Sequence, residues 1–467
     1  MDPPGATHEV PRSVQESAAT NGLRPDPLPA VERVTENQRD SGLLRSVGPL
    51  AFAASLFNAI IGAGIFVVPA ALSASMGPYA PLAFVVCAIA IGSAALCLAE
   101  GGSRVPTSGG IYGYIEVAFG PMVGYVTGTA LWFGNILACG GVAAALGDLV
   151  AGQVPPSYAI TVRAATIVGL VGGIALVNVA GARQGARLAS VATLLKLLPL
   201  LIFIAAGALA LHGSSYASSG PPSLENVDRG ILLALFAFTG MEVTLSASGE
   251  VAQPARSIPR ALALSISAVA LLYISIQVIA QGILGPALAH SSTPLADAMA
   301  RVSPLLRWLM LATATVSMIG WLSSDFLGSP RMLFAFGRDG MLPRVLGRVH
   351  EKSRTPYVAI LFYATLAIFF ALTGTFAKLA VLATLASALL YGTGSAAAWV
   401  LAQRGVAHAG PPLNSRWLGP AAIIAVGSML AMIGLAAVDE IIGLLALIVL
   451  SSLVYVLSVR IPVARRG

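Results

Sequence analysis

The sequence predicts an all-α integral membrane protein with twelve transmembrane helices, and three observations support that prediction. The 467 residues are 57% hydrophobic and only 10% charged, with a mean hydropathy of +0.84. A soluble globular chain carries about 25% charged residues, so this chain must cover its surface with apolar residues that face lipid. Its apolar residues form runs of about 20, enough to cross a hydrocarbon core of about 30 Å. Its basic residues gather in alternate loops.

Each of the twelve apolar runs is bounded by polar residues, glycine or proline. The third run is longer than one span needs, so we expect it to tilt or bend. The runs are 47–71, 79–100, 119–149, 161–180, 189–211, 230–250, 261–285, 305–329, 357–375, 379–402, 417–437 and 441–459.

The lysines and arginines orient these spans, because basic residues accumulate in cytoplasmic loops. With the amino terminus in the cytoplasm, 17 of them lie in cytoplasmic loops and the carboxyl-terminal tail, against five on the other side. We therefore expect a multi-pass protein of the cell membrane with both termini cytoplasmic. The five are Arg163, Arg229, Arg301, Arg307 and Lys378.

The chain divides into a polar tail and a transporter-sized membrane region. Residues 1–44 are polar and rich in proline and lack a signal-peptide core, so we expect a disordered cytoplasmic tail. Residues 45–285 would hold the first seven spans, residues 286–403 the next three, and residues 404–467 the last two with a short cytoplasmic tail.

Several classes of function have no support in the sequence. The basic residues are dispersed, so nucleic acid is not an expected partner. The three cysteines lie in apolar runs, and no histidine pair has metal-ligand spacing, so we expect no metal and no cofactor. The sequence contains no nucleophile–base pair that would indicate an enzyme and no phosphate-binding loop that would indicate transport driven by ATP. It also contains no repeated pore loop typical of a channel and no folded soluble domain typical of a sensor.

Two spans contain signals of interrupted helix. The first holds Gly62 and Gly64 around Ala63, and the sixth holds Gly240 with Glu242 beside it. Taken singly, such glycines more often mark close helix packing. Here the two spans are five apart, so a five-span repeat would invert the second copy, and paired interruptions in inverted halves point to a transporter site. Half-helix ends could bind both ends of a zwitterionic amino acid.

Four motifs resemble the amino acid–polyamine–organocation permeases over residues 44–460: IIGAGIF, LAEGGSRVPTSGGIYGYIEVAFGP, FAFTGMEV with GEVAQPARSIPRAL, and SPRMLFAFGRDGMLPRVLGRVHEKSRTP. The resemblance implies a leucine-transporter-type fold, with a 5+5 inverted repeat, two further helices, and broken helices 1 and 6. Phe236 stands where relatives carry an aromatic gate, and Ala63 stands where many carry serine. The implied substrate contacts are Ile60, Ile61, Gly62, Ala63, Gly64, Phe236, Ala237, Phe238, Thr239 and Gly240.

Lys196 lies deep in the fifth span, where a charge is costly unless it has a partner or a function. It is either a structural lysine bonded to carbonyls or, as in sodium-independent relatives that the motifs resemble, the group in the second sodium position. It would then bridge the broken first helix and a hydroxyl of span eight, with Ser323 and Ser324 as candidates. Glu242 matches an acid that relatives use in proton coupling or closure, with a silent buried pair as the alternative.

Asp325 in span eight has three interpretations: a partner for a cationic substrate side chain, a partner for Lys196, or a helix-end acid bonded to a cytoplasmic loop. Glu100 and Glu250 lie at helix ends near arginines, which favours loop or gate salt bridges.

The sequence therefore predicts a secondary active transporter of amino acids that is sodium-independent and works by alternating access, as a proton-coupled symporter or an exchanger. The alternative is a transporter or antiporter of cationic amines or polyamines, which the acids Asp325 and Glu242 would favour. The expected partners are a small-molecule substrate, protons and the lipid bilayer.

Overall fold

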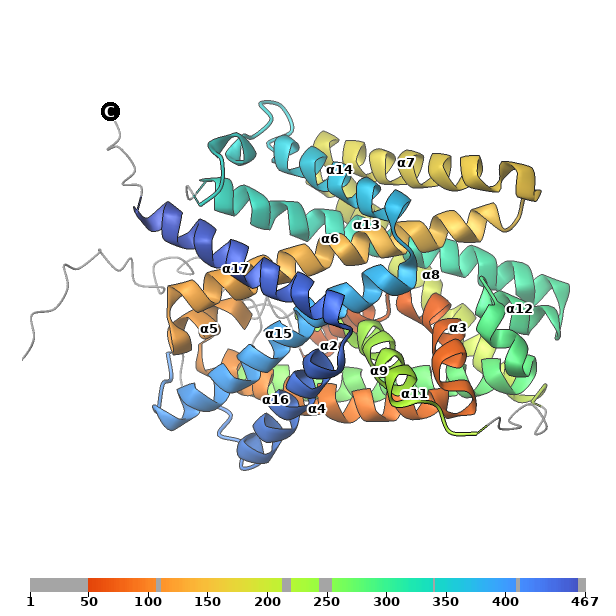
Figure 1. The fold of residues 1–467 in the computed structure, drawn as a ribbon, viewed down its shortest axis with the longest axis horizontal. Helices are drawn as coiled ribbons and strands as arrows, with labels where there is room; N and C mark the ends of the chain where they lie inside the picture. The colour runs from red at the N-terminus through yellow and green to blue at the C-terminus, as the bar shows by residue number, and fades with distance from the viewer. Residues whose placement is uncertain are drawn as a thin grey trace, which may run out of the picture. The chain divides into compact units, whose positions relative to one another are not determined.

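A computed structural model describes residues 49–105, 111–211, 220–242, 254–338, 341–408 and 412–460. Within these ranges the chain is helical and has no β-strand (Figure 1). The longer helices are α2 (Pro49–Ile60), α3 (Gly64–Met76), α4 (Ala80–Arg104), α5 (Ile111–Phe119), α6 (Pro121–Ala151), α7 (Pro156–Ala180), α8 (Ala182–Ala208), α9 (Leu224–Phe238), α11 (Pro254–Leu284), α12 (Pro294–Ala300), α13 (Pro304–Arg338), α14 (Tyr357–Thr373), α15 (Phe376–Gln403), α16 (Leu418–Leu435) and α17 (Val438–Arg460). Short 3₁₀ helices are η2 (Gly77–Tyr79), η5 (Gly285–His290) and η6 (Arg344–Gly347).

Eight helical stretches of the described chain are long and apolar enough to cross a membrane. Two further apolar helical stretches, Leu195–Ala208 and Tyr357–Thr373, are shorter. The protein is therefore an all-helical, multi-pass membrane protein. The eight stretches are Gly64–Arg104, Pro121–Ala151, Pro156–Ala180, Ser257–His290, Pro304–Arg338, Phe376–Gln403, Leu418–Leu435 and Val438–Ser458.

Proline and hydroxyl side chains set several helix starts. Proline occupies the first position of α6, α7 and α12, where its missing N–H costs nothing because that group has no partner within the helix. Ser223 caps α9 by accepting a hydrogen bond of 3.3 Å from the amide of Asn226. Thr375 caps α15 in the same way, at 3.4 Å from the amide of Lys378.

The helices pack in two groups, with α15 in contact with both. In one group α11 packs on α2 and α4, and α9 packs on α3 and α4; in the other, α6 packs on α7, α13 and α14, and α13 packs on α8. Figure 1 shows α7, α13 and α14 alongside the long α6. The helix α15 contacts α6, α4 and α9.

Small residues allow the closest helix approaches, as is usual where helices associate in lipid. A Cβ atom at Gly134 on α6 would lie 2.9 Å from the Cβ atom of Ala386 on α15. One at Gly140 would lie 2.9 Å from the Cβ atom of Phe370 on α14. In contrast, α17 leaves large apolar side chains exposed, including Ile442 and Leu450. Such a surface is suited to lipid.

Candidate functional site

The chain leaves the helical path between α2 and α3. The helix α2 ends at Ile60 and α3 begins at Gly64, so residues 61–63 lie outside both helices. The amide of Gly62 donates to the carbonyl of Ile60, two residues back, at 2.8 Å. Carbonyl groups at the end of a helix lack partners within it and must find donors elsewhere, and inside a membrane those donors must come from the protein.

Side chains from three other helices donate to three successive carbonyls of this interruption. The Tyr273 hydroxyl of α11 donates to the carbonyl of Ile60 at 3.1 Å. The Lys196 ammonium of α8 donates to the carbonyl of Ile61. The Ser317 hydroxyl of α13 donates to the carbonyl of Gly62 at 3.2 Å. All three donor side chains are buried, so α8, α11 and α13 together stabilise the interruption.

Close neighbours leave little room for a side chain on either side of Ala63. A Cβ atom at Gly62 would lie 2.6 Å from Cδ1 of Trp321, which belongs to α13. A Cβ atom at Gly64 would lie 3.1 Å from the Cα atom of Ala237 on α9. The glycines therefore allow the interruption to contact α13 on one side and the end of α9 on the other.

The helix α9 ends close to this point, at Phe238. The Thr239 hydroxyl folds back to the carbonyl of Phe236 at 2.7 Å, and Gly240 follows at φ 119°, a backbone angle that disfavours other residues. The amide of Gly240 donates to both carboxylate oxygens of Glu242, at 3.1 and 3.0 Å. The Tyr391 hydroxyl of α15 donates to the same carboxylate. Glu242 is buried, and its hydrogen bonds stabilise the turn after α9.

The end of α9 also meets the end of α2 directly. A Cβ atom at Gly240 would collide with the carbonyl oxygen of Ala59. The Tyr273 hydroxyl, besides contacting Ile60, lies 3.0 Å from the carbonyl oxygen of Ala237. The two segments that leave the helical path are therefore in contact with each other.

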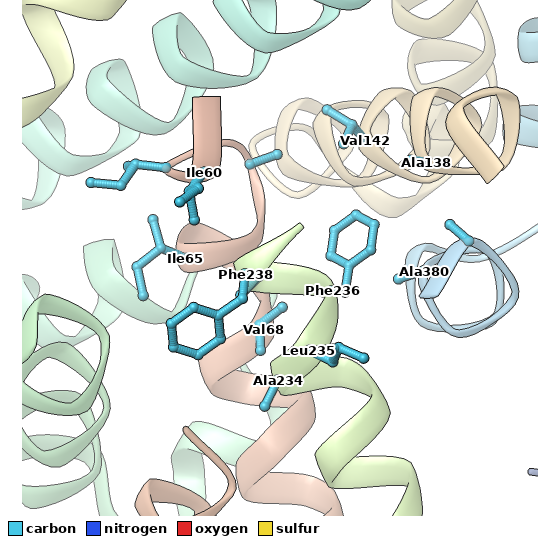
Figure 2. Packing of buried hydrophobic residues seen from close by; sticks show 14 of the residues in the cluster. Ile60, Ile65, Val68, Ala138, Val142, Ala234, Leu235, Phe236, Phe238 and Ala380 are labelled. Atoms are coloured by element: carbon cyan, nitrogen blue, oxygen red, sulfur yellow. The ribbon is translucent and has the colours of Figure 1, made fainter. Parts of the chain in front are cut away.

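The side chains around Phe236, near the end of α9, are apolar. Figure 2 shows Phe236 of α9 pointing between Ala138 and Val142 of α6 and Ala380 of α15. Its ring also meets the ring of Phe376 edge-on, with the centroids 5.5 Å apart. The side of the two segments that Phe236 covers is therefore apolar, whereas the side-chain donors Tyr273, Lys196 and Ser317 bond to the backbone of the interruption.

Asp325 lies on α13 and faces a different set of helices. Its Oδ1 accepts from the Ser329 hydroxyl and its Oδ2 from the Tyr363 hydroxyl of α14, both at 2.6 Å. The Ser329 hydroxyl also accepts from the side-chain amide of Asn135 on α6, at 3.0 Å. The carboxylate thus belongs to a hydroxyl network between α6, α13 and α14.

The serines of α13 differ in the carbonyl groups to which their hydroxyls donate. The Ser323 hydroxyl donates to the carbonyl of Ile319 in its own helix at 2.7 Å, and Ser324 is half-buried. Ser317, which the sequence analysis did not single out, is the α13 serine that donates to the interruption. It precedes Ser324 by seven residues and so shares its face of the helix, about two turns away.

Glu100 forms a salt bridge with a nearby arginine, as predicted, but the arginine belongs to the same helix and the loop after α15 binds Glu100 through backbone amides. The Arg104 guanidinium contacts its carboxylate at 2.8 Å, and the backbone amides of Asn414 and Ser415 donate to it at 3.1 and 3.0 Å. The pair is buried and fixes the chain between α15 and α16 onto the end of α4. Glu250 lies outside the described residues.

The geometry defines a class of site. The amino end of α3 carries partial positive charge and the carboxyl ends of α2 and α9 carry partial negative charge, so a small zwitterion could be bound between them. A membrane protein with such helix ends in its interior has the features of a transport protein.

The chain belongs to the amino acid permease family. A family model described as "Amino acid permease" matches residues 47–459, nearly the whole membrane region. Members of this family are permeases rather than enzymes, so the protein is a membrane transporter.

Curated relatives are transporters as well. The branched-chain amino acid permease BcaP of Bacillus subtilis is 27% identical over 74% of this chain and 78% of its own length. The methylthioribose transporter of Bacillus subtilis is 25% identical over 70% of this chain and 74% of its own length. The transporter Rv1999c of Mycobacterium tuberculosis is 33% identical over 68% of this chain and 71% of its own length.

Proposed function

We propose that the protein is a sodium-independent amino acid transporter that works by alternating access, as a proton-coupled symporter or an exchanger. The observation that supports this most is the hydrogen bond from the buried Lys196 ammonium to the carbonyl of Ile61. It lies at the interruption between α2 and α3, where the backbone leaves the helical path.

A protonated lysine at this position supplies the positive charge that a bound sodium ion would otherwise bring to these carbonyls. An ammonium group is covalently fixed to α8, so the interruption needs no ion from solution. The amine can also release and regain a proton while its side chain stays attached to α8. Lys196 is therefore the residue that we propose to couple protons to transport.

We propose twelve spans in the leucine-transporter-type arrangement. The first span would be α2 with α3, and the sixth would be α9 with the segment after it. The two interruptions then occupy the same place in two inverted halves of five spans each. The packing groups support this, because the first interrupted segment packs with α4 and α11 and the second with α4 and α15, rather than with α7 and α14. One group moving against the other would open the site to each side in turn.

The substrate that we propose is an amino acid with a neutral, apolar side chain. Its carboxylate would bind the amides at the start of α3, among them Ala63 and Gly64, and its ammonium group the carbonyls of α2 and α9. The apolar residues around Phe236 would receive the side chain (Figure 2). The name of the relative BcaP agrees with this class. The Asp325 carboxylate accepts from Ser329 and Tyr363, which belong to α13 and α14 and not to the interrupted segments; this weakens the case for a cationic side chain.

A thermal-shift screen of the purified protein tests this proposal. We expect leucine, isoleucine or valine to raise the melting temperature, and the matching amines without a carboxylate to leave it unchanged. Uptake of the stabilising amino acid into proteoliposomes should follow, with equal rates in sodium and in potassium buffer. Stabilisation by polyamines alone would favour the amine transporter instead, and uptake that requires sodium would contradict the proposal.

A further inference from the structure

One buried hydroxyl, that of Tyr273, contacts both interrupted segments. It lies 3.1 Å from the carbonyl oxygen of Ile60 at the end of α2, and 3.0 Å from the carbonyl oxygen of Ala237 in the last turn of α9. A helix leaves the carbonyls of its last turn without partners. The Tyr273 hydroxyl thus bonds to the carboxyl ends of two helices, α2 and α9, that are far apart in sequence.

The ring of Tyr273 is fixed in place by its neighbours. It packs against Phe84 of α4 and Phe238 of α9, with ring centroids 5.5 and 5.4 Å away. The side chain is fully buried. The hydroxyl position is consequently set by α4, α9 and α11 together, and the tyrosine cannot turn toward one carbonyl without moving its aromatic neighbours.

A tyrosine hydroxyl has a single proton to donate, and here two carbonyl oxygens share it. If either helix end moves away, the other keeps the proton. If both move together and Tyr273 moves with them, the shared contact persists. A shared donor of this kind favours joint displacement of the two segments over displacement of one alone.

We propose that Tyr273 is a positioning residue that ties the two interrupted segments, so that they bind substrate and shift as one unit. This inference rests on the proposed transport function and adds a positioning residue to it. Its effect is exerted through the backbone at Ile60 and Ala237.

The variant Tyr273→Phe tests the tie, because it keeps the ring and removes the hydroxyl. Tyr114→Phe is its matched control, since the Tyr114 hydroxyl is equally buried and has no hydrogen-bond partner among the described residues. In proteoliposomes we expect Tyr273→Phe to raise KM for the transported amino acid about tenfold, equivalent to about 1.4 kcal/mol, with the maximal rate within about twofold. We expect Tyr114→Phe to match the wild type. An unchanged KM in Tyr273→Phe, with or without a lower maximal rate, would overturn the tie.

A second measurement needs no substrate, and it separates the proposed role of Tyr273 from the proposed transport function. In hydrogen–deuterium exchange of the unliganded full chain, Tyr273→Phe should speed exchange in residues 60–64 and 236–241 together, and Tyr114→Phe in neither. A change confined to one segment, or to none, would refute the tie even if transport is normal. If the wild type carries no amino acid yet both segments respond together, the tie stands and the proposed function fails.

Discussion

Lys196 and Asp325 are both ionisable residues inside the membrane region, but their partners differ in kind. The Lys196 ammonium donates to a backbone carbonyl at a place where the helix is interrupted. Asp325 lies within the continuous helix α13 and accepts from two side-chain hydroxyls. An intramembrane charge is by default a functional candidate. The contrast teaches that a charge bonded to an interrupted backbone is the stronger candidate, since its bond can break when the backbone moves.

The largest effect on the interrupted region should come from Gly240→Ala. The variant forces a side chain into the φ 119° conformation and against the carbonyl oxygen of Ala59. We expect destabilisation of about 2 kcal/mol or more, with a lower melting temperature and little uptake. Gly427→Ala is the control, because a Cβ atom there has open space. If Gly240→Ala is as stable and active as this control, the two segments do not meet as described.

A smaller effect should follow from Ser317→Ala, which removes the donor to the carbonyl of Gly62. An unpaired buried carbonyl costs about 1–3 kcal/mol, so we expect uptake to fall by about tenfold. Ser323→Ala is the control, since its hydroxyl returns to the carbonyl of Ile319 within α13. Equal rates for the two variants in an uptake assay would argue against a role for Ser317 at the interruption.

The smallest effect should come from Asp325→Asn, because Asp325 lies within a continuous helix and not at the interruption. The amide keeps one acceptor for Ser329 or Tyr363, and either hydroxyl can accept from its amide hydrogen. We expect uptake, and its response to pH, to stay within about threefold of the wild type, since a lost hydrogen bond is worth about 0.5–1.5 kcal/mol. Loss of uptake with normal thermal stability would move Asp325 into the transport machinery.

Much of the helical fold could be predicted from hydropathy. The predicted run 379–402 lies within α15 (Phe376–Gln403), and the run 161–180 within α7 (Pro156–Ala180). The short helices α5 and α12 were not predicted, because nine and seven residues are too few for a hydropathy run. Their helical form depends on packing against α6, α13 and α15.

The candidate site, like the fold, could be predicted from the sequence only in part. Lys196 could be singled out because a charge in an apolar run is costly and therefore conspicuous. Tyr273 and Ser317 could not, because an uncharged hydroxyl is readily tolerated in a membrane helix. A serine such as Ser323 bonds to its own helix, and a serine such as Ser317 bonds to another. Which one occurs depends on tertiary packing, and no local sequence signal distinguishes the two.

Lys196 is the residue that we propose to provide both the charge at the interrupted first span and the proton coupling. The most direct test compares the wild type with Lys196→Ala in sodium-free proteoliposomes, using uptake of the stabilising amino acid with and without an inward proton gradient. We predict that the gradient accelerates wild-type uptake and leaves the residual uptake of the variant unchanged. A variant whose uptake still responds to the proton gradient as the wild type does would contradict the account and make Lys196 a structural residue.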